Sequence, residues 1–298
     1  MTPAIQSTFG LSSISVPVTL ALLLLAGVYV RGWLRLRSAT QNPISGWQPA
    51  AFINGMLALW IALGSPLRAL HHELLLMHMV DHILLIAVAP PLILLGAPFL
   101  SFSNGLPRFF RESLGVRLCL PPVYRLGPVL GHLIFCWLAA IIALIGWHIP
   151  AAFELSMRSN LWHEVEYACF FATGLLFWWP VIQPWPKEAR SPRWSIVLYL
   201  FFATLPCDML SAFLTFCDRV VYPCYLSGIR RFSISPLQDQ EYAGALMWVC
   251  VTFAYLIPAV VITTRLLSNS SAHDANVGPG DLPPVTAQPM AGPGVEVA

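Results

Sequence analysis

The segment HHELLLMHMVDHILLIAVAPPLILLGAP places four histidines, His71, His72, His78 and His82, at the start of an apolar run. Successive residues of a helix turn by about 100°, so His71, His78 and His82 are predicted to share one face. Ionisable side chains are costly inside a bilayer and tend to mark function there, and imidazole is the commonest metal-ligating side chain. At least two of these three are candidate ligands of a metal or haem. The alternative is that they only bind neighbouring helices, with His72 an interfacial residue.

A second cluster of polar residues occurs in WHIPAAFELSMRSNLWHEVEY. His148 ends one apolar run and His163 opens the next, so a short connection is expected to hold both at one membrane depth. Glu166 follows His163 by three residues and shares its helical face. A carboxylate there can orient an imidazole, as outer-shell acids do at metal sites. Glu164 is better explained by the preference of helix N-termini for acids.

A third cluster, LPCDMLSAFLTFCDRVVYPCY, carries Cys207, Asp208 and Met209 within an apolar run. Asp208 requires a partner at that depth, and a histidine of the first two clusters is the expected one. Thiol and thioether are soft ligands that select Cu(I), although packing in an apolar core is the more frequent role of both side chains. Cys217 and Cys224 lie beyond this run on the predicted oxidising side, where a disulfide is compatible with the sequence.

Familiar enzyme signatures do not appear in the chain. HELLLMH does not match the zinc-protease pattern H-E-x-x-H, and there is no G-x-S-x-G, P-loop, dinucleotide fingerprint or C-x-x-C-H haem attachment motif. We therefore expect no enzymatic activity. A basic stripe with interleaved aromatic residues is also missing, so nucleic acid is not an expected partner.

The composition indicates that these clusters are positioned by membrane helices. The 298 residues are 57% hydrophobic and 10% charged, whereas soluble domains carry about 25% charged residues. Bilayer-crossing helices need about 20 apolar residues, and such runs occur at 14–31, 47–64, 78–97, 129–148, 165–183, 194–215 and 241–263. The sequence thus predicts an all-α, seven-helix membrane bundle over 1–267, followed by a disordered tail over 268–298.

The distribution of lysine and arginine predicts the orientation of this bundle. Five of the sixteen fall at one end, namely Arg68, Arg158, Arg219, Arg230 and Arg231, and the others fall at the opposite end. The positive-inside rule makes the richer end cytoplasmic, so the N-terminus is expected outside and the C-terminal tail inside. Six of the eight histidines then gather on the outer side, where chemistry is predicted.

Four segments, in this order, resemble the CtaG-type cytochrome c oxidase assembly factors, which are multi-pass proteins of the bacterial plasma membrane. The similarity spans about 50–265, and the segments are HMVDHILLIAVAPPLILLGAP (78–98), WHIPAAFELSM (147–157), EYACFFATGLLFWWPVI (166–182) and VYPCY…SPLQDQEYAGALMW (221–248). The resemblance implies a role in maturing a haem–copper oxidase, with copper, as Cu(I), the implied metal. It also implies oxidase subunits, copper chaperones and membrane lipid as partners.

The family pattern also implies functional positions in this chain. These are His78, His82, His148, Glu166, Asp239 and Gln240. Relatives often carry Glu-His where this chain has Glu166 and Tyr167, so either a ligand is missing here or His163 supplies it. The candidate metal ligands are therefore His71, His78, His82, His148 and His163, with Glu166, Asp208, Asp239, Gln240, Cys207 and Met209 in support.

Several functions fit this pattern. The first is an assembly factor that holds Cu(I) transiently at the outer surface and delivers it to an oxidase subunit. The second is a haem-binding or quinone-linked redox protein with paired histidines on haem iron. A third is a metal or ion transporter, in which Pro90-Pro91 would break a helix. A non-catalytic scaffold for oxidase subunits is a fourth.

Overall fold

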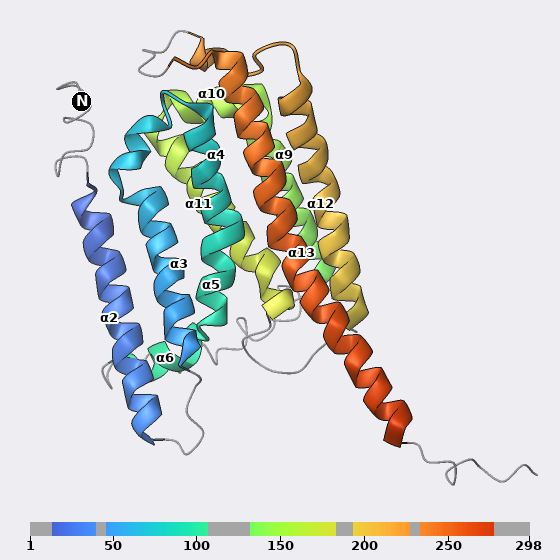
Figure 1. Ribbon diagram of the computed structural model, residues 1–298. Helices are drawn as coiled ribbons and strands as arrows, with labels where there is room; N and C mark the ends of the chain where they lie inside the picture. Colours follow the sequence, from blue (N-terminus) through green and yellow to red (C-terminus); the bar gives the residue numbers. More distant parts are fainter. Residues whose placement is uncertain (1–13, 40–45, 107–131, 183–192, 227–232, 277–298) are drawn as a thin grey trace, which may run out of the picture.

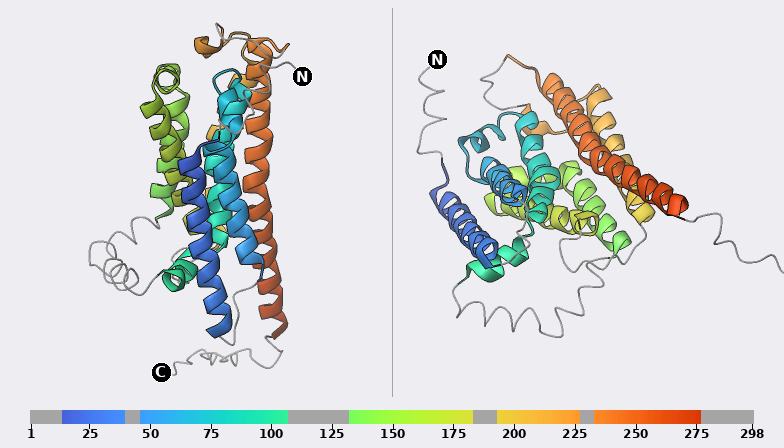
Figure 2. Two further views of the ribbon diagram at one scale, coloured as in Figure 1. Left: turned by 90° about the vertical axis from the view of Figure 1, so that its left-hand side faces the viewer. Right: turned by 60° about the horizontal axis from the view of Figure 1, so that its bottom comes forward.

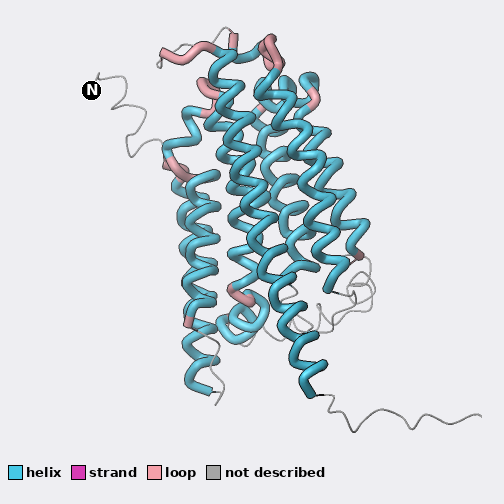
Figure 3. Tube along the Cα trace, turned by 45° about the vertical axis from the view of Figure 1, so that its right-hand side comes forward, coloured by secondary structure: helices cyan, strands magenta, loops and turns pink. Residues whose placement is uncertain are grey.

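The computed structural model of the chain describes residues 14–39, 46–106, 132–182, 193–226 and 233–276. These residues form helices joined by short turns, and no strand occurs among them (Figures 1 and 3). The main helices are α2 (Val16–Ala39), α3 (Trp47–Leu63), α4 (Leu75–Ile83), α5 (Ala89–Leu95), α9 (Leu133–His148), α11 (Asn160–Ile182), α12 (Arg193–Phe216) and α13 (Pro236–Asn276). The shorter ones are η2 (Pro66–Leu70), α6 (Pro98–Gly105), α10 (Pro150–Arg158) and η4 (Pro223–Tyr225).

Among the described residues, six helices, or seven if one bent pair is counted as a span, are long and apolar enough to cross a membrane. The bent pair is α9 with α10, whose axes differ by 74°. Ile149 has an extended backbone before Pro150, as residues preceding proline prefer, and this ends α9. The all-helical membrane fold predicted from the sequence is therefore confirmed, but a helix, α10, replaces the simple connection expected between His148 and His163.

The third span is one continuous helix made of three segments. Between α4 and α5 the backbone forms a π-turn, η3 (Leu84–Val88), just before Pro90 and Pro91, which lack the N–H groups that an α-helix requires. The carbonyl of Ile86 instead accepts a hydrogen bond of 2.9 Å from the indole of Trp178 on α11. A Cβ atom on Gly174 would lie 3.0 Å from Ile86, so only glycine lets α11 approach this turn so closely. The proline pair therefore deforms the span without breaking it, and the deformed middle of the span packs against α11.

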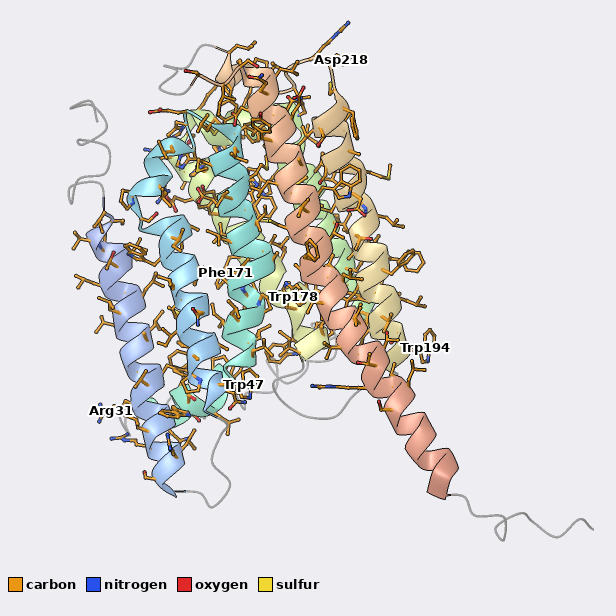
Figure 4. The ribbon with its side chains drawn as sticks, in the orientation of Figure 1. Arg31, Trp47, Phe171, Trp178, Trp194 and Asp218 are labelled. Atoms are coloured by element: carbon orange, nitrogen blue, oxygen red, sulfur yellow. The ribbon has the colours of Figure 1, made fainter. Side chains whose placement is uncertain are left out.

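The bundle has two distinct ends. At one end lie α10, η4 and the first residues of α4, α11 and α13, and at the other lies α6 (Figure 1). The bundle is bounded on one side by α2, which packs on α6, and on the other by the pair α12 and α13 (Figure 2). Arg31, Trp47 and Trp194 lie toward the α6 end and Asp218 toward the α10 end (Figure 4). This spacing of charges and tryptophans fits a bilayer between the two ends.

The last helix is longer than expected. It runs to Asn276, so residues 268–276 continue α13 rather than forming part of the predicted tail. The rest of that tail, 277–298, lies outside the described residues.

Candidate metal centre

Three side chains from two helices converge at the α10 end of the bundle. His78 and His82, one turn apart on α4, point their Nε2 atoms at Oε1 of Glu166 on α11, at 3.6 and 3.2 Å. One ligand atom from each of the three residues fits within 4.8 Å of the others. His78 and Glu166 are fully buried and His82 is nearly so. Two imidazoles and a carboxylate in this arrangement form a candidate three-ligand metal site.

Apart from the approaches of His78 and His82 to Glu166, the polar atoms around this group lack hydrogen-bond partners among the described residues. They are both ring nitrogens of His71, His78 and His82, both carboxylate oxygens of Glu166, and Nε2 of His148 and of His163. Each unsatisfied buried polar atom costs about 1–3 kcal/mol, and native proteins contain few of them. Their concentration in one place fits a ligand-binding site, because a bound cation would use the lone pairs that the protein leaves free.

His148 is oriented for ligation by its own helix. Its Nδ1 lies 2.7 Å from the carbonyl oxygen of Leu144. That contact fixes the proton on Nδ1, so the buried Nε2 carries the lone pair. The ring of His148 lies 5.6 Å from that of His82, so it extends the centre toward the end of α9.

His71 and His163 lie on the other side of His78. Their rings stack at 4.5 Å, and lie 6.1 and 5.7 Å from the ring of His78. The expectation that His71 continues the helical face of His78 and His82 is wrong, since His71 follows η2 and α4 begins only at Leu75. Chain folding, rather than helical periodicity, brings it near.

Burial controls the charge of His71, which lies between two spans. Burial, reinforced by the neighbouring His163, His72 and His78 and by Arg68, lowers the pKa of His71 to about 2. The ring is therefore neutral at physiological pH and its lone pair is available to a metal.

Aromatic side chains hold the histidines in place. Phe153 of α10 contacts the ring of His78 at 4.9 Å, and Phe170 of α11 contacts that of His82 at 4.2 Å. Next to η4, Tyr222 donates a hydrogen bond to the carbonyl of His148, and Tyr225 donates one to the carbonyl of His71. These two tyrosines explain the VYPCY segment (221–225), because they tie the loop before α13 to the ends of two other elements.

Asp81 and Tyr167 form a buried polar pair beside the centre. The hydroxyl of Tyr167 donates to Oδ2 of Asp81 at 2.6 Å, and the same oxygen lies 3.8 Å from Nδ1 of His71. Tyr167 occupies the position where histidine was noted for relatives, and its ring lies 4.3 Å from that of His163. Tyr167, the residue next to Glu166, thus donates a hydrogen bond to Asp81. The imidazole near Tyr167 is that of His163.

Asp239 and Gln240 bind backbone rather than metal. The carboxylate of Asp239 accepts from the N–H groups of Leu75 and Leu76, at 2.6 and 3.1 Å. Leu74, the N-cap residue of α4, provides no side-chain cap, so Asp239 of α13 caps the helix that carries His78 and His82. Gln240, fully buried, accepts from Val221 and donates to the carbonyls of Leu214 and Arg219.

The α12 cluster lies partly outside the centre. Asp208 was expected next to a histidine, but its carboxylate instead faces Thr252 of α13 at 3.5 Å. Met209 is 75% exposed and points away from the bundle. Cys207 is buried and, with Met247, lines a cavity that His82 and His148 also line. The structure therefore brings Cys207 toward the centre and not Asp208 or Met209. Cys217 and Cys224 are free thiols, so the disulfide considered for them is not formed.

Sequence patterns gave no role to Asp81, Tyr167, Phe153, Tyr222 or Tyr225. The only available signal for Asp81 was an acid between two histidines inside an apolar run. Tyrosine and phenylalanine are common in apolar segments, so nothing in their spacing distinguished the four aromatic residues.

Comparisons with known proteins agree with this architecture. An uncharacterised protein of Mycobacterium bovis and one of Mycobacterium tuberculosis are each 25% identical over 236 residues, which cover 76% of this chain and 34% of the relative. An uncharacterised protein of Mycobacterium leprae is 24% identical over 259 residues, covering 84% of this chain and 38% of the relative. The chain thus spans about a third of the length of these relatives. No solved structure matches it. The model of the cytochrome c oxidase caa3 assembly factor family matches residues 27–269, and the chain belongs to that family.

Proposed function

We propose that this protein assists the assembly of a haem–copper cytochrome c oxidase by holding Cu(I) at His78, His82 and Glu166 and delivering it to an oxidase subunit. The observation that carries the proposal is the convergence of three buried donor side chains without hydrogen-bond partners, in a chain of the oxidase assembly family. The protein binds and releases the ion and performs no catalytic step.

The chemistry of the donor set supports copper as cargo. Imidazole suits copper, and the carboxylate of Glu166 offsets the charge of the ion. His148 and the thiol of Cys207, which share a cavity with His82, supply further ligands compatible with Cu(I). Delivery is an exchange of ligands: each bond from copper to an imidazole breaks as a bond to the acceptor forms. Copper stays in one oxidation state, so no oxidant or reductant is needed.

Copper affinity tests the proposal directly. We expect the full chain in detergent to retain Cu(I) against a chromophoric chelator and His78→Ala with His82→Ala to abolish that retention. His132→Ala is the matched control, since His132 is exposed and precedes α9 at the other end of the bundle. Equal retention by the double variant and the control would overturn the proposal.

The location of the centre is part of the proposal. More of the described arginines lie toward the α6 end than toward the α10 end, so we place the α10 end outside the bacterial plasma membrane. In a cysteine-free background, Asp218→Cys should react with a membrane-impermeant thiol reagent in intact cells and Ser38→Cys should not. Both positions are exposed. Asp218 lies toward the α10 end (Figure 4), and Ser38 lies in the last turn of α2, which packs on α6. The reverse pattern would place the centre on the cytoplasmic side.

Haem binding and transport are separated from copper delivery by two measurements. A haem ligated by His82 and His148 would give the purified protein a strong Soret band, which copper delivery does not. A transporter would move metal across vesicle membranes containing only this chain, whereas an assembly factor requires an acceptor subunit.

A further inference from the structure

Five buried histidines and the exposed His72 form a line of neighbouring rings rather than one compact group. Neighbouring ring centroids are 4.1, 4.5, 5.7, 4.3 and 5.6 Å apart, in the order His72, His71, His163, His78, His82 and His148. Each imidazole is therefore in near contact with the next. The line connects the surface of the α10 end to the interior of the bundle.

Only the first histidine of this line lies at the surface. His72 is exposed, whereas the exposed fractions of the other five histidines lie between 0% and 5%. The site at His78 and His82 is buried, so an ion has to pass other residues to reach it. The line provides lone pairs over that distance, because His71 and His163 retain free ring nitrogens in the described structure.

The outer pair differs from the inner group in geometry. The rings of His71 and His163 are stacked, with 28° between their planes. A metal ion lies in the plane of the imidazole that binds it, so two stacked rings cannot both bind one ion without rotating. The compact three-ligand group comprises only His78, His82 and Glu166. The outer pair therefore suits brief binding, whereas the inner group suits retention.

Acidic groups offset the positive charge of an ion along the line. Asp81 lies 3.8 Å from His71, and Glu166 lies 3.2 Å from His82. The one guanidinium that neighbours the outer pair in the described structure, that of Arg68, pairs with Glu164 and covers the ring of Tyr167 at 5.7 Å. Its charge is thus balanced, and a cation passing His71 and His163 has the carboxyl group of Asp81 beside it.

We propose that His71 and His163 form an entry station, through which a soft cation passes from the surface to the site at His78, His82 and Glu166. This inference rests on the proposed function and adds to it a route with two separate steps. The ion moves by exchange of nitrogen ligands, each new bond replacing an old one, with no change of oxidation state.

The rate of copper loading tests the route. The full chain in detergent is mixed with Cu(I) held by a weak chromophoric chelator, and transfer is followed in a stopped-flow instrument. The test variant His71→Phe with His163→Phe preserves two stacked rings but removes their nitrogens. Loading should slow by at least about tenfold, a barrier increase of about 1.4 kcal/mol, while the affinity at equilibrium changes by less than about twofold. Release should slow by the same factor, because the equilibrium is unchanged.

The outcomes distinguish this inference from the proposed function. Wild-type protein that binds no Cu(I) would overturn the proposed function. Normal loading by the test variant would overturn only the entry station. Slow loading with an equally reduced affinity would mean that His71 and His163 belong to the same site as His78 and His82. That result would also overturn the entry station. The milder His163→Gln, expected to show the same kinetic effect to a smaller degree, keeps the test decisive if the double variant folds poorly.

Discussion

Glu166 and Asp208 are both acids inside apolar spans, yet the structure treats them differently. Glu166 is fully buried on α11 and faces the imidazoles of His78 and His82. Asp208 is partly buried on α12 and faces the hydroxyl of Thr252. One acid is the meeting point of several unpartnered donors, and the other satisfies a local hydrogen bond between neighbouring helices.

The difference shows that an acid within a span is not in itself evidence of a site. Both residues are acids within apolar runs, which makes either a functional candidate when the sequence alone is known. What distinguishes Glu166 is convergence, since ligand atoms from a second helix lie within 4.8 Å. The following experiments compare the two environments, beginning with the largest expected effect.

The largest effect should come from removing both imidazoles that face Glu166. We expect His78→Ala with His82→Ala to lower Cu(I) affinity by more than about 100-fold, since loss of an outer-shell partner alone costs 10–100-fold. Oxidase activity in membranes should fall to the level of a deletion strain while the protein remains as abundant as the wild type. Leu84→Ala, in the same span, should act only through abundance. Wild-type oxidase activity in the double variant would refute the metal-handling role.

The two acids can be compared directly by isosteric substitution. Glu166→Gln preserves volume but removes the negative charge, so Cu(I) affinity should fall by about 10–100-fold. Equilibrium competition with a chelator measures this loss. The ratio of the Cu(I) affinities of Glu166→Gln and Asp208→Asn compares the two acids directly.

Asp239 should act on the centre through the position of α4. Removing an N-terminal cap costs about 0.5–2 kcal/mol of stability, so Asp239→Ala should lower the melting temperature. Copper affinity should decline less than in Glu166→Gln, because both imidazoles remain. Glu241→Ala, two residues along α13, is the control and should change neither property. A melting temperature unchanged by Asp239→Ala would argue against the capping role.

The smallest effect is expected at Asp208. Asp208→Asn retains an acceptor for Thr252, and no imidazole contacts this side chain in the described structure. Copper affinity should therefore remain within about twofold of wild type, well under the tenfold that corresponds to 1.4 kcal/mol. A large loss of affinity would mean that Asp208 belongs to the centre after all, and would remove the distinction between the two acids.

The helices and the two histidines of the candidate site on α4 could be predicted from the sequence because their signals are local. Apolar runs located each membrane helix, and the four-residue spacing of His78 and His82 placed both on one face. The family pattern added Glu166, Asp239 and Gln240. Glu166 can meet His78 and His82 once the third and fifth spans are neighbours.

The remaining features depend on contacts between distant segments. The cap on α4 comes from Asp239, and the hydroxyl on Asp81 comes from Tyr167, in each case from another helix. His71 was placed on a helical face, but the turn after η2 carries it to the centre by another route. The position of Asp208 within an apolar run could be read from the sequence. The face of α12 that contacts the other helices could not.

The central claim is that two imidazoles and one carboxylate hold the copper. X-ray absorption of the Cu(I)-loaded full chain measures this most directly. The account predicts nitrogen and oxygen neighbours with the outer-shell scattering of about two imidazole rings, and the loss of this pattern in Glu166→Gln with His82→Ala. A spectrum dominated by sulfur would instead place the ion at Cys207 and Met247, and either that spectrum or the absence of retained copper would contradict the account.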